Sequence, residues 1–390
     1  MKRFYQKLFT ASLGIALSGL VAATSVKAVV ISNSVVALGV NPVGSLVDTG
    51  VDIGLTFLPT SGEALAPGCA CEAWGVADAT SGSTGSAGQS TGNTPNLSVV
   101  SFSSTATSAV SVVSVGGVFE VTHDFHPSLS SNLFEVTVTI LNTTNVTVNP
   151  RYRRAMDWDV PPTEFDEYVT INRGSAANLL FSSDNGFATG NPLAGPSWVI
   201  SNTVNKSVVE NGPADHGAVF DFGFAPLAPG SNITFNIYYG AAANKAQAIA
   251  AVKRVGGEVF SFGQPSSPGG KSLGTPNTFI FAFQGVGGAP ITNFGGCDTA
   301  TGLIDQINGL SELKSSQKRS LARIANIVGR AADRSNFYGA RKECGVINRR
   351  LAALVRRGTI DSLTAQSVAE CCAGLATAPA SVTVLLDTGE

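Results

Sequence analysis

The chain has 390 residues, of which 44% are hydrophobic and 13% are charged, and it contains 43 glycines. This length and this hydrophobic content are enough for one or two domains with a sizeable core, so the composition excludes a chain that is disordered throughout. The 25 Lys and Arg residues nearly balance the 27 Asp and Glu residues, and the net charge of −2 excludes a polybasic nucleic-acid binder.

The first 28 residues have the pattern of a secretory signal peptide. Three basic residues among the first seven precede a weakly hydrophobic run from Leu8 to Ala23, and Val26-Lys27-Ala28 has the small residues of a cleavage site. The run is too polar and too short for a membrane span of roughly 20 apolar residues, although a retained anchor helix is the alternative. We expect cleavage after Ala28 and a secreted protein, either free outside the cell or held at a bacterial cell surface.

The six cysteines are expected to form disulfides, because an even count is typical of proteins that fold in an oxidising compartment. The spacing does not determine the pairing, since six cysteines allow many schemes. Cys69-Ala70-Cys71 and Cys371-Cys372 leave thiolate metal ligands as the alternative, although neither has the spacing of a zinc ribbon. The candidates are Cys69, Cys71, Cys297, Cys344, Cys371 and Cys372.

Residues 29–284 have the pattern of short antiparallel strands. Hydrophobic and polar residues alternate from Phe134 to Ile140, as expected where one face of a strand packs on a core and the other meets water. Turn sequences such as Gly116-Gly117 separate these segments. The pattern predicts a mainly β body, an antiparallel β-sandwich of one large or two small units. The same alternation occurs at 110–115, 118–125, 169–171, 218–224 and 233–239.

Three segments differ from this pattern. Residues 241–255 are rich in alanine with helical spacing and are followed by Gly256-Gly257, which predicts one helix. Residues 80–94 contain only Ser, Thr, Gly, Ala, Gln and Asn, so they have nothing to bury and are expected to form a loop. The glycine-rich residues 285–300 are expected to form a linker.

Residues 301–375 are expected to form a small helical domain, followed by a tail at 376–390. Apolar residues recur at intervals of three and four from Leu321 to Val328 and from Ala340 to Leu354, which predicts two antiparallel helices. A third helix is predicted from Thr364 to Ala373.

The charges are divided unequally between the two parts. Residues 29–300 hold 9 basic and 19 acidic residues, whereas residues 301–390 hold 12 and 8. Arginines at 349–350 and 356–357 lie beside the apolar stripe of the second helix. They form either a solvated face or a contact for an acidic polymer or for the acidic body itself.

The helical part also resembles a known family. Over residues 301–375 the chain resembles the FIMAH module, a helical unit at the C-termini of secreted bacterial proteins. The resemblance implies association outside the cell rather than chemistry, and the pair Cys371-Cys372 and the many arginines depart from the family pattern. The segments that carry the resemblance are Leu303-Ile304-Asp305-Gln306-Ile307, Ala340 and Cys344 with Ile347-Asn348-Arg349-Arg350-Leu351, Gly358-Thr359-Ile360 and Leu363-Thr364-Ala365-Gln366.

The candidate functional residues lie in the most charged stretch of the body, residues 151–167. Asp157, Asp159 and Glu164 suit acid/base catalysis on a glycoside, in which two carboxylates flank the scissile bond. Together with Asp166 they alternatively suit Ca²⁺, which binds carboxylate oxygens. In a purely structural interpretation, arginines of the stretch pair with the carboxylates and the aromatic face packs in the core.

Five residues are candidates for ligand contacts, namely Arg153, Trp158, Asp166, His126 and His216. The histidines would serve a site only if the fold brings them to the carboxylates, and a hydrogen-bonded structural role is the alternative.

We therefore expect a secreted, non-catalytic β-sandwich protein that binds a polysaccharide or another cell-surface polymer, with calcium as the candidate ion and no other cofactor. The alternative is a secreted hydrolase or lyase that acts on polysaccharide through Asp157, Asp159 and Glu164. A structural component of an extracellular matrix or envelope is a third hypothesis. None of the three involves nucleic acid, and no transmembrane segment is expected in the mature chain.

Overall fold

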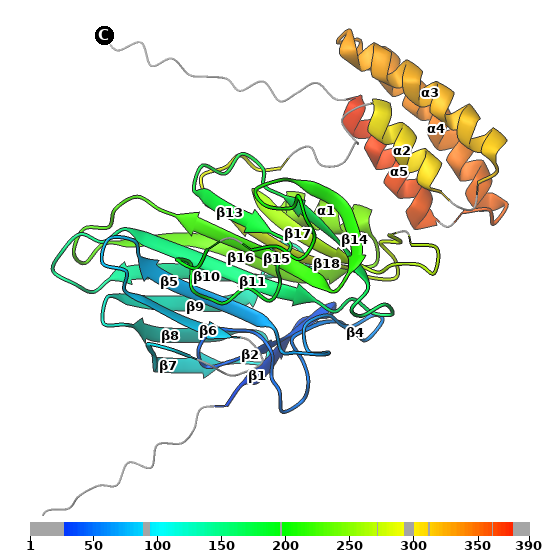
Figure 1. The fold of residues 1–390 in the computed structure, drawn as a ribbon. Helices are drawn as coiled ribbons and strands as arrows, with labels where there is room; N and C mark the ends of the chain where they lie inside the picture. Colours follow the sequence, from blue (N-terminus) through cyan, green and yellow to red (C-terminus); the bar gives the residue numbers. More distant parts are fainter. Residues whose placement is uncertain are drawn as a thin grey trace, which may run out of the picture.

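The computed structural model describes residues 27–88, 94–195, 197–270, 272–291, 300–310, 313–360 and 362–376 (Figure 1). Most of the predicted signal peptide (1–28), residues 292–299 of the predicted linker (285–300), nearly all of the predicted tail (376–390) and Cys297 lie outside the described residues.

Within the described ranges, the strands form three antiparallel sheets, which confirms the predicted mainly β body with C-terminal helices. A four-stranded sheet has the order β1 (Val29–Ser32), β2 (Val36–Val40), β3 (Leu55–Phe57), β4 (Gly62–Glu63). A five-stranded sheet has the order β13 (Leu179–Ser183), β15 (His216–Gly223), β11 (Pro150–Trp158), β5 (Glu72–Asp78), β6 (Thr84–Gly88). The nine-stranded sheet has the order β14 (Val208–Ala214), β12 (Glu167–Asn172), β17 (Val259–Gln264), β18 (Thr278–Gln284), β16 (Asn232–Ala242), β10 (Leu133–Asn142), β9 (Phe119–Pro127), β8 (Ala109–Val115), β7 (Leu97–Ser104).

Aromatic side chains hold the five-stranded sheet against the nine-stranded sheet. The ring of Phe222 on β15 lies 4.7 Å from that of Phe283 on β18, and Tyr152 on β11 lies 5.0 Å from Phe235 on β16, measured between centroids. These residues belong to one buried cluster that also includes side chains of the four-stranded sheet. The core therefore lies between the sheets, as a sandwich requires.

Helix α1 (Lys245–Arg254) covers the other face of the nine-stranded sheet. Its buried Ala248 and Val252 cluster with Phe262 and Ile280, whereas the neighbours of Ile280 along β18 face the five-stranded sheet. The helix begins later than the alanine pattern predicts, because residues 241–242 pair with β18 as the end of β16. Asn244 caps the helix by accepting a hydrogen bond from the Gln247 backbone N–H at 3.0 Å.

The prediction of a loop at residues 80–94 is wrong for its central part. Residues 84–88 form β6, which pairs with β5. A Cβ at Gly85 would lie 2.6 Å from a methyl group of Val115, so the strand needs small residues rather than the alternating apolar ones that normally reveal a strand. Residues 89–93 lie outside the described part of the chain.

The C-terminal helices have a core of their own. They are α2 (Ala300–Gly309), α3 (Ser315–Asp333), α4 (Phe337–Arg356) and α5 (Ser362–Leu375), and their buried residues form a cluster that contains no residue of the β body. Cys344 of α4 and Cys372 of α5 form a disulfide, and Cys371 is disulfide-bonded as well. No described helix has both the length and the hydrophobicity needed to cross a membrane.

We predict that replacing both Cys344 and Cys372 with alanine destabilises the helical unit without affecting the body. The disulfide closes a loop of 28 residues, so its loss should lower the unfolding free energy of the helices by about 3 kcal/mol. Differential scanning calorimetry should show one transition moving to lower temperature and a second, from the body, unchanged. A single transition that moves as a whole would contradict the presence of two separate cores.

Candidate functional site

The end of β11 holds two of the predicted carboxylates in buried positions. The backbone N–H of Asp157 donates to the carbonyl of Cys71, and that of Asp159 donates to the carbonyl of Ala64, both at 3.0 Å. These bonds fix the strand end between two loops. As a result, Asp157 is 2% exposed and Asp159 is fully buried.

Glu167 and Asp215 join these two residues from other strands. Glu167 begins β12, is fully buried and accepts a hydrogen bond from the backbone N–H of His216 at 3.0 Å. Asp215 is exposed between β14 and β15. One carboxylate oxygen from each of Asp157, Asp159 and Asp215 lies within 4.8 Å of the others. We call these four residues the acidic cluster.

Several buried oxygens of the acidic cluster have no hydrogen-bond partner. They are Oδ1 of Asp157, both carboxylate oxygens of Asp159 and Oε2 of Glu167. Among the described residues, no Lys or Arg forms an ion pair with the four carboxylates. A buried carboxylate without a partner is costly unless it is protonated or binds a cation.

The electrostatics of the acidic cluster follow from this burial. Desolvation, with the charge of Asp215, raises the pKa of Asp157 to about 7. Desolvation and the neighbouring carboxylates Asp157 and Asp215 raise the pKa of Asp159 to about 8. Desolvation likewise raises the pKa of Glu167 to about 9, although its bond from His216 acts in the opposite direction. The raised pKa values favour the protonated, neutral forms of these three carboxyl groups when no cation is bound.

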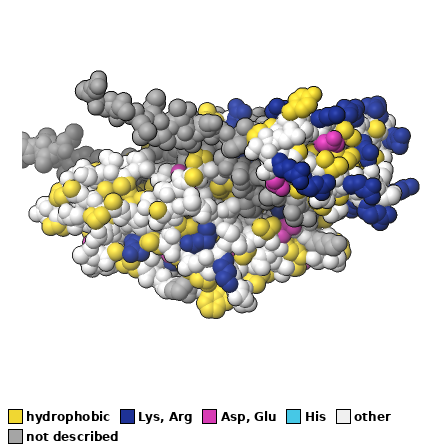
Figure 2. All heavy atoms as spheres, turned by 90° about the horizontal axis from the view of Figure 1, so that it is seen from above, with side chains coloured by type: hydrophobic (Ala, Val, Ile, Leu, Met, Phe, Trp, Pro, Cys, Tyr) yellow, Lys and Arg dark blue, Asp and Glu magenta, His cyan; other side chains and the backbone are white. Residues whose placement is uncertain are grey.

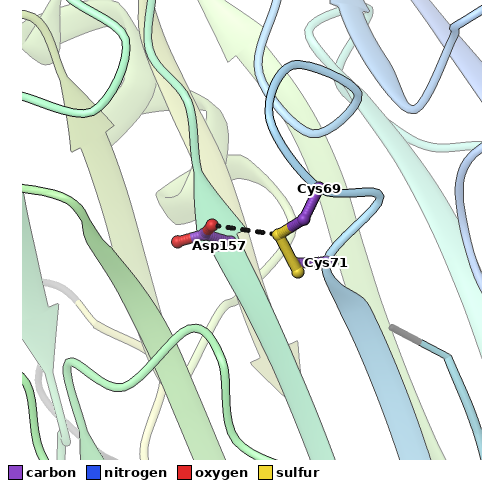
Figure 3. A group of neighbouring side chains, drawn as sticks. All are labelled: Cys69, Cys71 and Asp157. Carbon is purple, nitrogen blue, oxygen red and sulfur yellow. Dashed lines mark hydrogen bonds between the residues drawn. A yellow bond between two sulfur atoms is a disulfide. The ribbon is translucent and has the colours of Figure 1, made fainter. Parts of the chain in front are cut away.

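The Cys69–Cys71 disulfide borders the acidic cluster (Figure 3). The Sγ atom of Cys69 lies 3.6 Å from Oδ2 of Asp157. A disulfide sulfur carries no hydrogen, so a hydrogen bond across this contact requires the proton to be on Asp157. The expectation of disulfides is confirmed for the described cysteines, and none of them is a free thiolate.

The other two predicted calcium ligands differ in their placement. Glu164 is half-buried, and its charge contributes to the raised pKa of Asp159. Asp166 is exposed and accepts a hydrogen bond from Ser266 Oγ at 3.3 Å. Glu164 and Asp166 do not join Asp157 and Asp159 in the acidic cluster, because Pro161 to Asp166 form a turn between β11 and β12. Glu167 and Asp215, which were not predicted from the sequence, complete the cluster instead. Glu167 contributes a buried carboxyl group and Asp215 an exposed one.

Arg153 and Trp158 are buried by internal contacts rather than exposed to a ligand. Arg153 donates two hydrogen bonds to Asp221, at 2.6 and 2.7 Å, and Trp158 Nε1 donates to Ser261 Oγ at 3.1 Å. Arg153 and Arg154 of β11 therefore do pair with carboxylates, but with Asp221 and Glu72 rather than with Asp157 or Asp159.

The two histidines do not converge. His216 is buried beside the acidic cluster, with Nδ1 3.2 Å from Asp184 Oδ2 and Nε2 3.3 Å from the carbonyl oxygen of Glu167. His126 lies on β9 of the nine-stranded sheet, where its ring nitrogens contact the carbonyl of Pro127 and the hydroxyl of Thr137. Only His216 can influence the acidic cluster.

Comparison with known proteins gives little. No protein-family model matches the chain, and no curated protein matches it. Among solved structures, the chain is similar to a galactose mutarotase related enzyme from Lactobacillus acidophilus. The match covers 66% of this chain and 86% of that one, with 11% sequence identity and a TM-score of 0.25. Similarity at this level carries no argument about function.

We predict that the cation-free body loses stability as the pH rises from 5 to 9. The buried carboxyls keep protons up to a pH of about 7 to 9, whereas in the unfolded chain they lose them near pH 4. Because the unfolded state binds fewer protons in this window, each of the three groups lowers the unfolding free energy by about 1.4 kcal/mol for every pH unit below its folded-state pKa. The total is several kcal/mol, so the melting temperature in EDTA should fall by roughly 10 °C or more.

The variant Asp159→Asn is the matched comparison, because it removes one titrating group and keeps the side-chain shape. Its melting temperature in EDTA should depend less steeply on pH than that of the wild type. Equal slopes for the two proteins would show that Asp159 does not titrate in this window.

Proposed function

We propose that this protein is a secreted, non-catalytic binding protein in which a calcium ion stabilises the β body and the basic helical unit binds an acidic polymer. The observation that carries the first part is the set of buried carboxylate oxygens of Asp157, Asp159 and Glu167 without partners. The second part rests on the charge of the helices.

The chemistry of the acidic cluster suits calcium. Ca²⁺ binds six to eight oxygen ligands at roughly 2.3–2.6 Å, so two oxygens on one ion are separated by at most about 5 Å. The oxygens of Asp157, Asp159 and Asp215 lie within 4.8 Å of one another. Asp215 is exposed, which gives the ion a route from solvent and leaves positions for water.

The same distances argue against glycoside cleavage. The two carboxyl groups of a retaining glycosidase are roughly 5–5.5 Å apart, and those of an inverting enzyme roughly 6.5–9.5 Å. One oxygen of Asp157 lies within 4.8 Å of one oxygen of Asp159, and both residues are almost completely buried, which disfavours contact with a sugar. The geometry therefore favours an ion over a substrate.

The helical unit has a strongly basic surface (Figure 2). Lys342, Arg349 and Arg356 are exposed on α4 at intervals of seven residues, which places them on one face of the helix. Arg319, Arg323 and Arg330 are exposed along one face of α3. Rows of positive charge of this kind favour a linear polyanion, and the resemblance to FIMAH modules supports an associating role outside the cell.

We predict that calcium raises the melting temperature of the body by several degrees, and that Asp159→Asn abolishes this effect by removing a fully buried ligand. The variant Asp166→Asn removes the same charge from an exposed neighbouring position and should behave as the wild type. Isothermal titration calorimetry on the mature chain measures the calcium affinity of the wild type and of each variant. Loss of calcium binding in Asp166→Asn as well as in Asp159→Asn would favour the ligand set predicted from the sequence, which contains both residues.

We predict that the mature chain binds polygalacturonate, an acidic polysaccharide. Its affinity should fall steeply between about 50 and 300 mM salt, because salt screens exposed ion pairs. Reversing two charges of α4, by Arg349→Glu with Arg356→Glu, should weaken binding at least about tenfold. Reversing Lys206 and Lys253 of the body, which are exposed and half-exposed, is the control and should have no effect on polymer binding. Binding that survives the α4 variant would place the polymer site elsewhere.

A further inference from the structure

The Cys69–Cys71 disulfide lies directly before β5 and faces the end of β11. Cys69 is half-buried and Cys71 is 6% exposed, so Cys69 is the more accessible of the two residues to solvent. One ligand atom from each of Cys69, Cys71 and Asp157 lies within 4.8 Å of the others (Figure 3). Asp157 is nearly buried, and its Oδ1 atom has no hydrogen-bond partner.

These positions match the dimensions of a zinc site. With Zn–S bonds of roughly 2.3 Å and Zn–O bonds of roughly 2.0–2.2 Å, a tetrahedral zinc ion places a sulfur ligand about 3.5 Å from an oxygen ligand. The Sγ of Cys69 is 3.6 Å from Oδ2 of Asp157. The Cα atoms of the two cysteines are 5.0 Å apart. Once the disulfide is reduced, the two sulfurs need to move apart only slightly for both to bind one ion.

We propose that reduction of the Cys69–Cys71 disulfide creates a zinc site with Cys69, Cys71 and Asp157 as ligands. An external dithiol supplies two electrons: it closes to its own disulfide as the protein S–S bond breaks, and its two protons pass to the cysteine sulfurs. Zinc then binds the two sulfurs as thiolates and releases these protons to solvent. The half-buried position of Cys69 leaves the fourth position of the tetrahedron open to water.

This site goes beyond the calcium site and does not depend on it. The two share only Asp157, because the zinc site needs neither Asp159 nor Glu167. In the oxidised protein this corner offers oxygen ligands, which hard cations prefer, whereas reduction adds thiolates, which select zinc. The redox state of one disulfide thus determines which class of metal the corner prefers.

Cobalt titration of the full mature chain tests the proposal, because Co²⁺ bound by thiolates has a sulfur-to-metal charge-transfer absorption. The reduced wild type, kept free of oxygen, should develop this absorption and the visible bands of tetrahedral cobalt, and one equivalent of Zn²⁺ should remove them. The comparison is the double variant Cys69→Ser with Cys71→Ser, reduced in the same way. It retains the other four cysteines, so any contribution from them appears in both proteins.

The expected result is a charge-transfer absorption that is larger in the reduced wild type than in the reduced double variant, and that the oxidised wild type lacks. Asp157→Asn should keep the charge-transfer band but weaken cobalt binding at least tenfold, whereas Asp159→Asn should bind cobalt as the wild type does and lose only calcium. Circular dichroism confirms that each reduced protein is folded. Equal spectra and equal affinities in the reduced wild type and the double variant would overturn the proposal, whatever the outcome for calcium.

Discussion

The structure around the end of β11 depends on one electrostatic constraint, the burial of carboxylates that no positive side chain compensates. Asp159 is fully buried with neither oxygen bonded, and Asp157 and Glu167 each have one oxygen without a partner. Desolvation of this kind favours the neutral form, which is why the pKa values of all three groups are raised. A proton or a cation must therefore supply the missing charge, and the choice between them depends on pH and on the ions present.

The rest of β11 shows how the same strand handles charge when compensation is available. Arg153 forms a two-bond pair with Asp221, and the fully buried Arg154 donates to Glu72. Removing one partner from such a pair leaves an uncompensated buried charge, which is strongly destabilising. The buried carboxylates of the acidic cluster have no positive partner among the described residues, so the cluster differs from a structural ion pair. This contrast supports the proposal that Asp157 and Asp159, rather than the arginines of β11, form the binding site.

The sequence predicted those features that have a short-range pattern. The alternation from Phe134 to Ile140 identified β10, and apolar spacing identified α3 and α4, because a buried face repeats at the period of its element. Asp157 and Asp159 were predicted because they are close in the chain. Their partner Asp215 lies 56 residues beyond Asp159 and reaches them only through the pairing of β11 with β15, which no local pattern shows.

Glycines explain why these strands approach closely enough to build the site. Gly217 pairs with Asp157, and a Cβ there would lie 1.9 Å from the carbonyl oxygen of Met156. A Cβ at Gly186 would lie 2.8 Å from Oδ1 of Asp157. The backbone therefore encloses Asp157 on two sides, so its carboxylate has little freedom to turn toward solvent when no ion is bound. In the proposed calcium site Asp157 would therefore be ordered before the ion binds, which lowers the entropy cost of binding.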